Sequence, residues 1–312
     1  MSVSVKTLEQ NAPIKKGVLE KVKKMATVNQ KTAPYVFLAP VILIFMVFMV
    51  YPIIKSLILC TQTFVNGEYV YVGASNFVKL FKDPIFWKSL SNTFIYLIIQ
   101  VPIMVFLSLV LAVLLDSKFL KIKGFFRMSL FLPAITALVA YAMIFKLMLN
   151  TEYGMVNHFI SLLGMDKIDW LNTAWGARMS VIMGITWRWT GYNMIIMIAG
   201  LQGIPTELYE SAEIDGANHF QKFWGITIPM VKPIILFVAM TSTIGTLQLF
   251  DESYILTSGG PDNATITIGH YLYNNGFQFF KFGYASAISY TLVVIIALLS
   301  YLQFKVSKGG EV

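Results

Sequence analysis

Six long apolar runs constrain the fold of this chain more than any other feature. Each is close to the ~20 residues that an α-helix needs to cross a bilayer. Only 13% of the residues are charged, about half the share that is usual in soluble domains. Lipid-exposed backbone must satisfy its own hydrogen bonds, and runs this long do not suit barrel strands, so we predict an all-α membrane protein with six transmembrane helices. The predicted spans are Tyr35–Leu59, Asn92–Leu115, Met128–Leu149, Met179–Leu201, Pro233–Leu249 and Tyr284–Phe304.

The segments outside the spans predict the orientation. Residues 1–34 are predicted to form a basic cytoplasmic tail with seven lysines, residues 35–305 a six-helix transmembrane domain, and residues 306–312 a short cytoplasmic C-terminal tail. The loop between the second and third spans is also basic. Short basic loops stay in the cytoplasm, so both termini are predicted to be cytoplasmic in a multi-pass protein of a bacterial cell membrane. The net charge of +8 therefore reports orientation in lipid, and we expect no nucleic-acid partner.

Composition also excludes several kinds of chemistry. Cys60 is the single cysteine, so no intrachain disulfide can form. The three histidines lie far apart in the sequence, which offers no metal site. No Gly-Lys dipeptide occurs, so the chain has no Walker A phosphate loop. We expect no enzymatic activity and no cofactor in this chain, and any ATP must be bound by another one.

The loop of residues 203–229, between the fourth and fifth spans, has the pattern of two short helices. Pro205 suits a helix entrance, and Thr206 is predicted to cap the first helix. Asp215-Gly216 is predicted to end it, because Gly216 is free to adopt a left-handed conformation. Taken alone, these residues leave open a hairpin that merely connects two spans.

The second helix of this loop has its own signals. Asn218 followed by Gln221 predicts a capping box at its start. Pro229 is predicted to stop it before the chain re-enters the membrane.

This loop resembles the EAA motif of ABC-importer permeases. That motif has Glu-Ala-Ala, three further residues, Gly, about nine residues, and then an apolar residue and Pro. Ser211 replaces the second-position alanine here, and Ile228 stands where leucine is common. In that family the motif is the coupling helix, which sits in a cleft of the ATPase subunit. The resemblance implies coupling roles for Glu210, Ser211, Ala212, Asp215, Gly216, Ile228 and Pro229.

A second stretch resembles the MalF-type carbohydrate permeases of the same superfamily. Thr257-Ser-Gly259-Gly260-Pro261 follows the fifth span, as Thr-x-Gly-Gly-Pro does in that group. Asn92-Thr93-Phe94 and residues 283–287 are similar to the same group. The resemblance covers roughly residues 35–305 and implies the MetI-like fold of a type I ABC importer permease.

The family resemblance also implies the partners and the cargo. They are a second homologous permease subunit, two copies of an ATP-binding subunit that hold ATP and magnesium, and an extracytoplasmic sugar-binding protein. The cargo is a sugar, expected to be an oligosaccharide. The permease, which is surrounded by membrane lipid, is expected to move this sugar across the membrane by alternating access.

The fourth span carries the strongest candidates for a sugar site. Arg188, Trp189 and Tyr192 share one helical face, and sugar sites combine aromatic faces with hydrogen-bonding groups. A cation at mid-membrane is costly, so Arg188 must face a cavity or a partner, such as Asp251 or a residue of the companion permease. Helix packing of the tryptophans and a structural ion pair of Arg188 remain alternatives. By family resemblance, the fifth span contributes Ser242, Gly245, Thr246 and Leu249, of which Ser242 and Thr246 would present two hydroxyls on one face.

Two other functions remain open. Arg188 keeps open a permease for an anionic cargo, such as a glycerol phosphate or an acidic sugar. A secondary transporter driven by an ion gradient is the alternative from another class, although inverted repeats and buried carboxylates at broken helices are not evident.

Overall fold

The computed structural model describes residues 33–117 and 120–307, which divide into two units at Ile58 and Leu59. Nearly all of the two predicted tails, residues 1–34 and 306–312, lies outside the described residues. The first unit contains α2 (Ala33–Phe45), the π-helical turn η1 (Met46–Val50) and most of α3 (Tyr51–Leu59). Together they form one 27-residue apolar helix, so the first predicted span is confirmed as a helix.

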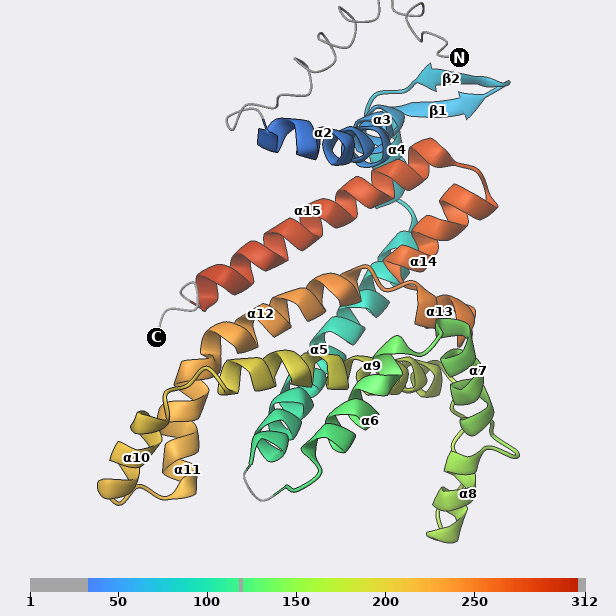
Figure 1. The fold of residues 1–312 in the computed structure, drawn as a ribbon. Helices are drawn as coiled ribbons and strands as arrows, with labels where there is room; N and C mark the ends of the chain where they lie inside the picture. Colours follow the sequence, from blue (N-terminus) through green and yellow to red (C-terminus); the bar gives the residue numbers. More distant parts are fainter. Residues whose placement is uncertain (1–32, 118–119, 308–312) are drawn as a thin grey trace, which may run out of the picture. The chain divides into compact units, whose positions relative to one another are not determined.

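The second unit holds the remaining elements, most of them helices (Figure 1). They are β1 (Gln62–Val65), β2 (Glu68–Tyr71), α4 (Ser75–Phe81), α5 (Pro84–Asp116), α6 (Lys123–Ile135), α7 (Leu138–Met148), α8 (Met155–Leu162), α9 (Ala174–Leu201), α10 (Thr206–Ile214), α11 (His219–Lys222), η2 (Phe223–Thr227), α12 (Ile228–Leu247), α13 (Asp251–Ile255), α14 (Ile268–Tyr273), η3 (Asn274–Gln278) and α15 (Phe282–Val306).

Four helical stretches of the described chain are long and apolar enough to cross a membrane, which confirms the all-α membrane fold. They are Ala33–Leu59, Pro84–Asp116, His219–Ile255 and Phe282–Val306. The fourth predicted span corresponds to α9, whose 28 residues are also enough to cross the ~30 Å hydrocarbon core at 1.5 Å per residue.

The third predicted span, Met128–Leu149, is wrong as a single helix. It is broken into α6 and α7, which bend by 99° relative to each other and count as a fifth span only if taken together. Thr136 and Ala137 between them have extended backbone, with ψ angles of 138° and 129°. Pro133 in the last turn of α6 removes one helical hydrogen-bond donor just before this break.

The second predicted span begins eight residues earlier than Asn92, at Pro84. Asp83 caps α5 by accepting a hydrogen bond from the backbone N–H of Ile85 at 2.9 Å, and a proline at the first helical position fits this cap. The hydroxyls of Tyr271 and Tyr284 also donate to the Asp83 carboxylate. This one side chain therefore fastens α14 and α15 to the start of α5.

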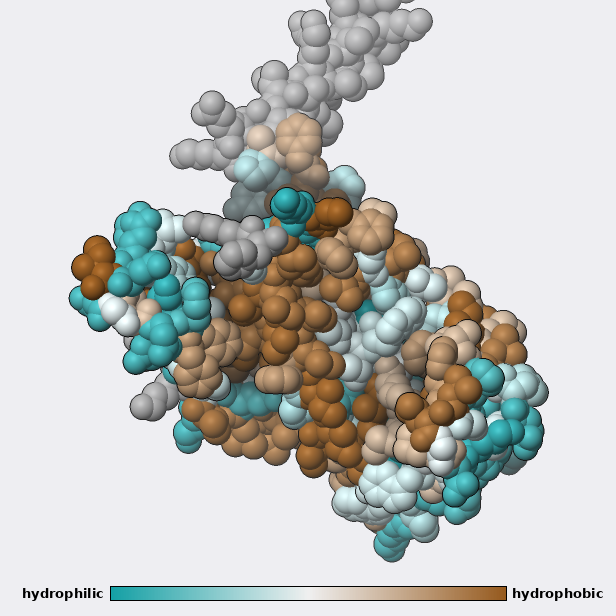
Figure 2. Space-filling model, turned by 90° about the horizontal axis from the view of Figure 1, so that it is seen from below, coloured by the Kyte–Doolittle hydropathy of each residue, from teal (hydrophilic) through white to brown (hydrophobic). Residues whose placement is uncertain are grey.

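Helices α5 and α9 pack together at the centre of the second unit, with α6 and α12 against them. Their shared core is apolar and includes Leu109, Met194, Met197 and Val238. Gly191 allows α6 to approach α9, because a Cβ there would lie 1.7 Å from the carbonyl oxygen of Leu130. On the face shown in Figure 2, hydrophobic side chains cover the middle, and hydrophilic ones gather on either side of it. Exposed apolar surface of this extent suits contact with lipid.

Candidate functional site

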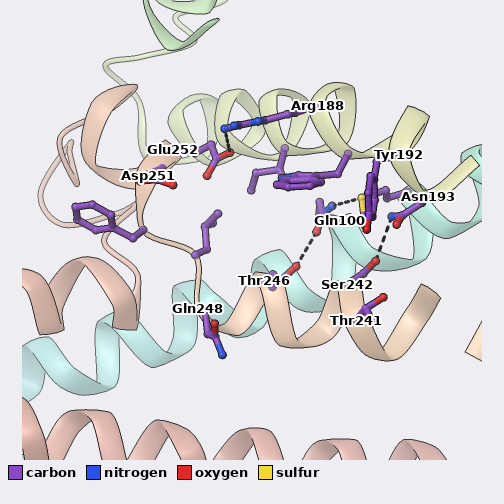
Figure 3. A pocket seen from close by; sticks show the side chains of 16 residues that line it. Gln100, Arg188, Tyr192, Asn193, Thr241, Ser242, Thr246, Gln248, Asp251 and Glu252 are labelled. Atoms are coloured by element: carbon purple, nitrogen blue, oxygen red, sulfur yellow. Dashed lines mark hydrogen bonds and ion pairs between the residues drawn. The ribbon is translucent and has the colours of Figure 1, made fainter. Parts of the chain in front are cut away.

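A cavity of about 280 Å³ lies between α5, α9, α12 and the turn that leads into α13 (Figure 3). All seven residues predicted to bind substrate line this cavity, although they come from two helices and a turn. Its lining comprises Gln100, Met104, Ile185, Arg188, Trp189, Tyr192, Asn193, Thr241, Ser242, Gly245, Thr246, Gln248, Leu249, Phe250, Asp251 and Glu252. The structure thus brings the candidates together, and their role in binding stays a prediction.

One end of the cavity carries a buried ion pair. Arg188 Nη1 lies 3.7 Å from Glu252 Oε1, and only 14% and 4% of the two side chains are exposed. The Arg188 guanidinium also lies 5.2 Å from the ring centroid of Tyr141 and 5.5 Å from that of Trp189, which suits cation–π attraction. The partner is thus Glu252 and not the predicted Asp251, because neighbouring residues of the short helix α13 point in different directions.

Polar groups at the other end are already engaged with each other. The Asn193 amide donates to Ser242 Oγ at 3.2 Å, and Thr246 Oγ1 donates to Gln100 Oε1 at 3.1 Å. Ser242 and Thr246 do line the same cavity, as predicted, yet their hydroxyls also join α12 to α9 and α5. Gly245 between them leaves open space, since a Cβ built there meets no atom within 4 Å.

The two aromatic candidates form part of the cavity wall. Trp189 and Tyr192 meet edge to face at 5.7 Å between ring centroids, and 38% and 43% of them remain exposed. Trp187 has a different position, because it contacts Tyr141 and Phe145 at 6.1 Å and 5.3 Å. The packing alternative therefore applies to Trp187, whereas Trp189 presents an aromatic surface to the cavity.

Sequence reasoning missed several lining residues. Gln100 is fully buried in α5. Its amide lies in an otherwise apolar span, and a polar group there is costly in lipid, so the sequence could have predicted that Gln100 faces the protein interior, as it did for Arg188. Asn193 and Glu252 lie next to residues that were recognised. Their inward orientation depends on how α9 and α13 pack, which no local pattern specifies.

The predicted coupling loop is a helical hairpin, formed by α10 and α11, that projects beyond the ends of α9 and α12 (Figure 1). The first helix ends as predicted, since Gly216 adopts a left-handed φ of 80°. The predicted capping box is confirmed: Gln221 N–H donates to Asn218 Oδ1 at 2.9 Å, and Asn218 N–H donates to Gln221 Oε1 at 2.8 Å. Thr206 is not the cap; it is the first helical residue, and Pro205 before it offers no side-chain hydrogen bond.

The prediction that Pro229 stops the second helix is wrong. The chain passes from α11 through the π-helical turn η2 into α12 without a break. Pro229 is the second residue of α12, and the wider η2 turn before it accommodates a residue without a backbone N–H. Tyr209 OH lies 2.8 Å from Thr227 Oγ1, which ties α10 to this continuous helix.

The predicted coupling residues divide into two groups. Glu210, Ser211, Asp215 and Gly216 are exposed on the hairpin, and Ala212 is half-buried there. Ile228 and Pro229 lie half-buried at the start of α12. Large apolar side chains on the hairpin are also exposed, with Ile214 at 87%, Phe220 at 71% and Trp224 at 56%. The hairpin thus offers a surface with both acidic and apolar contacts.

The Thr-Ser-Gly-Gly-Pro segment is held by a buried polar network. Ser253 Oγ contacts His270 Nδ1 at 2.8 Å and donates to the carbonyl of Thr265 at 2.7 Å. Asn92 donates to the carbonyls of Asn263 and Ile266 at 2.9 Å and 3.0 Å. Thr265 Oγ1 in turn donates to the carbonyl of Gly260 at 2.9 Å, so Asn92 and Thr265 together fix the loop that follows α13.

His270 makes this network sensitive to pH. Burial lowers the pKa of the His270 imidazole from 6.5 to about 4. Because the unfolded chain binds this proton more readily, His270 stabilises the fold above about pH 6.5, and that stability is lost as the pH falls toward 4. Between about pH 7 and pH 5, the melting temperature of the purified wild type is expected to fall by about 5 °C more than that of His270→Asn. Parallel melting curves for the two proteins would contradict this.

Comparison with known proteins agrees with the fold and the predicted family. Residues 72–308 match the model of the family described as binding-protein-dependent transport system inner membrane component. The lactose transport system permease protein LacF of Rhizobium radiobacter is 46% identical over 275 residues, which cover 86% of this chain and 92% of the relative. The arabinooligosaccharide permease protein AraP of Halalkalibacterium halodurans is 37% identical, with 91% of each chain covered.

A solved structure supports the same fold. A chain of a bacterial alginate ABC transporter, crystallised with its alginate-bound periplasmic protein, superposes with a TM-score of 0.78 at 24% identity. The match covers 88% of this chain and 93% of the other. The predicted resemblance to MalF-type permeases is thereby confirmed, and this chain belongs to the binding-protein-dependent transport system inner membrane components, the transport subunits that form the membrane path of ABC importers.

Proposed function

We propose that this chain lines half of the path by which an ABC importer moves an oligosaccharide into the cell, and that the cavity of α5, α9 and α12 holds the sugar. The cavity itself carries this proposal. Trp189 and Tyr192 present partly exposed rings, which suit the apolar face of a pyranose, and amide and hydroxyl groups opposite them suit sugar hydroxyls. Relatives named for lactose and arabinooligosaccharide transport support a sugar as cargo.

In this proposal, energy comes from partner subunits. Two copies of an ATP-binding subunit hold ATP and magnesium, and one of them receives the hairpin of α10 and α11. A second homologous permease forms the other half of the path, and an extracytoplasmic binding protein delivers the sugar. Both termini and the hairpin lie on the cytoplasmic side. The basic N-terminal tail and the basic loop between the second and third predicted spans support this orientation.

The side chains of this chain orient the cargo and transmit movement. ATP binding closes the ATPase pair and displaces the hairpin, which shifts α12 relative to α9 and opens the cavity outward. Hydrolysis returns the helices and opens the cavity inward. The hydrogen bonds of Ser242 with Asn193 and of Thr246 with Gln100 cross the interfaces that such a shift changes.

Reconstitution with the partner subunits tests the proposal. The cognate binding protein is first screened for neutral oligosaccharides, among them lactose and arabinotriose, that raise its melting temperature. The sugar with the largest shift is then offered to proteoliposomes, and we expect accumulation only with ATP and the binding protein present. Accumulation driven by a proton or sodium gradient without ATP would contradict the proposal and favour a secondary transporter.

A further inference from the structure

The cavity wall carries three ionisable side chains, two of which pair with each other within the protein. Among the described residues that line the cavity, the ionisable acidic and basic side chains are Arg188, Asp251 and Glu252. Arg188 and Glu252 lie 3.7 Å apart, and Figure 3 shows them together at one end, with Asp251 beside them. A cargo in the cavity therefore meets one positive and two negative groups, and the positive one is already paired.

The pairing leaves hydrogen-bond donors of Arg188 unused. A guanidinium has five N–H donors in a planar fork, and Nη1 lies 3.7 Å from Glu252 Oε1, which is longer than a hydrogen bond. Nε is buried and has no hydrogen-bond partner among the described residues, so the donors that a cargo could use are those of the Nη atoms. The rings of Tyr141 and Trp189 flank the group. Arg188 can therefore donate to a sugar hydroxyl while Glu252 cancels its charge.

We propose that Glu252 is a specificity-determining residue that makes this cavity select uncharged sugars over acidic ones. The inference rests on the proposed function, because it concerns the cargo of the same cavity. Without Glu252, an unpaired Arg188 would attract a uronate or a phosphate ester. With it, an anion meets the surplus negative charge of Asp251 and Glu252 in surroundings where charges interact more strongly than in water.

A cysteine reporter measures the cavity charge without requiring the identity of the cargo. Gly245→Cys places a thiol in the lining at a position with space for its Cβ, and the buried native thiol is removed as Cys60→Ala. The purified complex in detergent is treated with sulfonatoethyl methanethiosulfonate, an anion, or with trimethylammonium-ethyl methanethiosulfonate, a cation. The ratio of the two modification rates is compared with that of Tyr153→Cys, an exposed site on another loop.

Opposite shifts are expected for the two members of the pair. Glu252→Gln should raise the anion-to-cation rate ratio at residue 245 by about tenfold, and Arg188→Gln should lower it. The double variant carries an uncharged pair, so it avoids an isolated buried charge and should return the ratio close to its starting value. The ratio at Tyr153→Cys should not change. An unchanged ratio at residue 245 in Glu252→Gln, with the double variant folded, would overturn the proposal.

The same reporter separates this inference from the proposed function. Lactose or arabinotriose should slow the modification of the cysteine at position 245 in the reporter protein that keeps Glu252. Digalacturonate should slow this modification only in the reporter protein that also carries Glu252→Gln. Protection by digalacturonate that is equal in both proteins would overturn the role of Glu252. Failure of both neutral sugars to protect, with the expected rate ratios intact, would instead count against the cavity as the sugar site.

Discussion

Deletion of Glu210–Gly216 is expected to abolish ATP-driven uptake and to release the ATP-binding subunit from the membrane complex. The deletion removes the end of α10 together with the left-handed turn at Gly216. It also removes Ile214, the most exposed apolar side chain of the hairpin. Copurification of the ATP-binding subunit and uptake in proteoliposomes measure the two effects, and both should fall by at least about tenfold, because central interface residues carry most of the binding energy.

A matched point variant controls for general damage to the hairpin. Glu213→Gln removes one charge from a side chain that is 73% exposed and that pairs at 3.5 Å with Lys222, of which 12% is exposed. A pair that is open to solvent on the glutamate side contributes little, so this variant should keep coupled uptake. Normal coupled uptake by the deletion variant would show that α10 is not the coupling helix.

Replacement of Trp189 and Tyr192 by alanine should have the second large effect. Each substitution removes an aromatic surface from the cavity wall, and the pair meets edge to face at 5.7 Å. We expect transport at low sugar concentration to fall by about tenfold or more in each variant, since aromatic burial is among the larger single contributions to binding. Uptake at a series of sugar concentrations, together with sugar-stimulated ATPase activity, provides the measurement.

Trp175→Ala is the matched control for this series. Trp175 begins the same helix, is 57% exposed and does not line the cavity. Its removal should leave the concentration dependence of uptake unchanged, and all variants should still copurify with the ATP-binding subunit. Unaltered uptake in both Trp189→Ala and Tyr192→Ala would place the sugar elsewhere.

The sequence predicted features that depend on local chemistry. The capping box of Asn218 and Gln221 and the left-handed Gly216 follow from side-chain hydrogen bonding and from the absence of a Cβ, and both are present. The hairpin of β1 and β2 could also have been predicted from the sequence. Its turn is Asn66-Gly67, with φ angles of 51° and 89°, and that dipeptide strongly favours tight two-residue turns.

Features that depend on how the helices pack could not be predicted from the sequence as well. The break between α6 and α7 lies inside a uniformly apolar run, where hydropathy cannot distinguish a bent helix from a straight one. The sequence predicted Asp251 as the partner of Arg188 instead of its neighbour Glu252, because both are acidic and the sequence does not show which of the two faces Arg188. The contacts of α13 with α7, α9 and α14 fix the orientation in which Glu252 faces Arg188.

The unbroken path from α11 through η2 to α12 has a mechanical consequence. His219 at the hairpin and Thr246 at the cavity belong to one continuous rod, which at 1.5 Å per residue is about 40 Å long. A helix of this length would convert a small tilt at one end into a larger displacement at the other, and the π-helical turn η2 and Pro233 are the points where it can bend. In the proposed mechanism, the length of this helix would determine how far the cavity wall moves in each cycle of ATP hydrolysis.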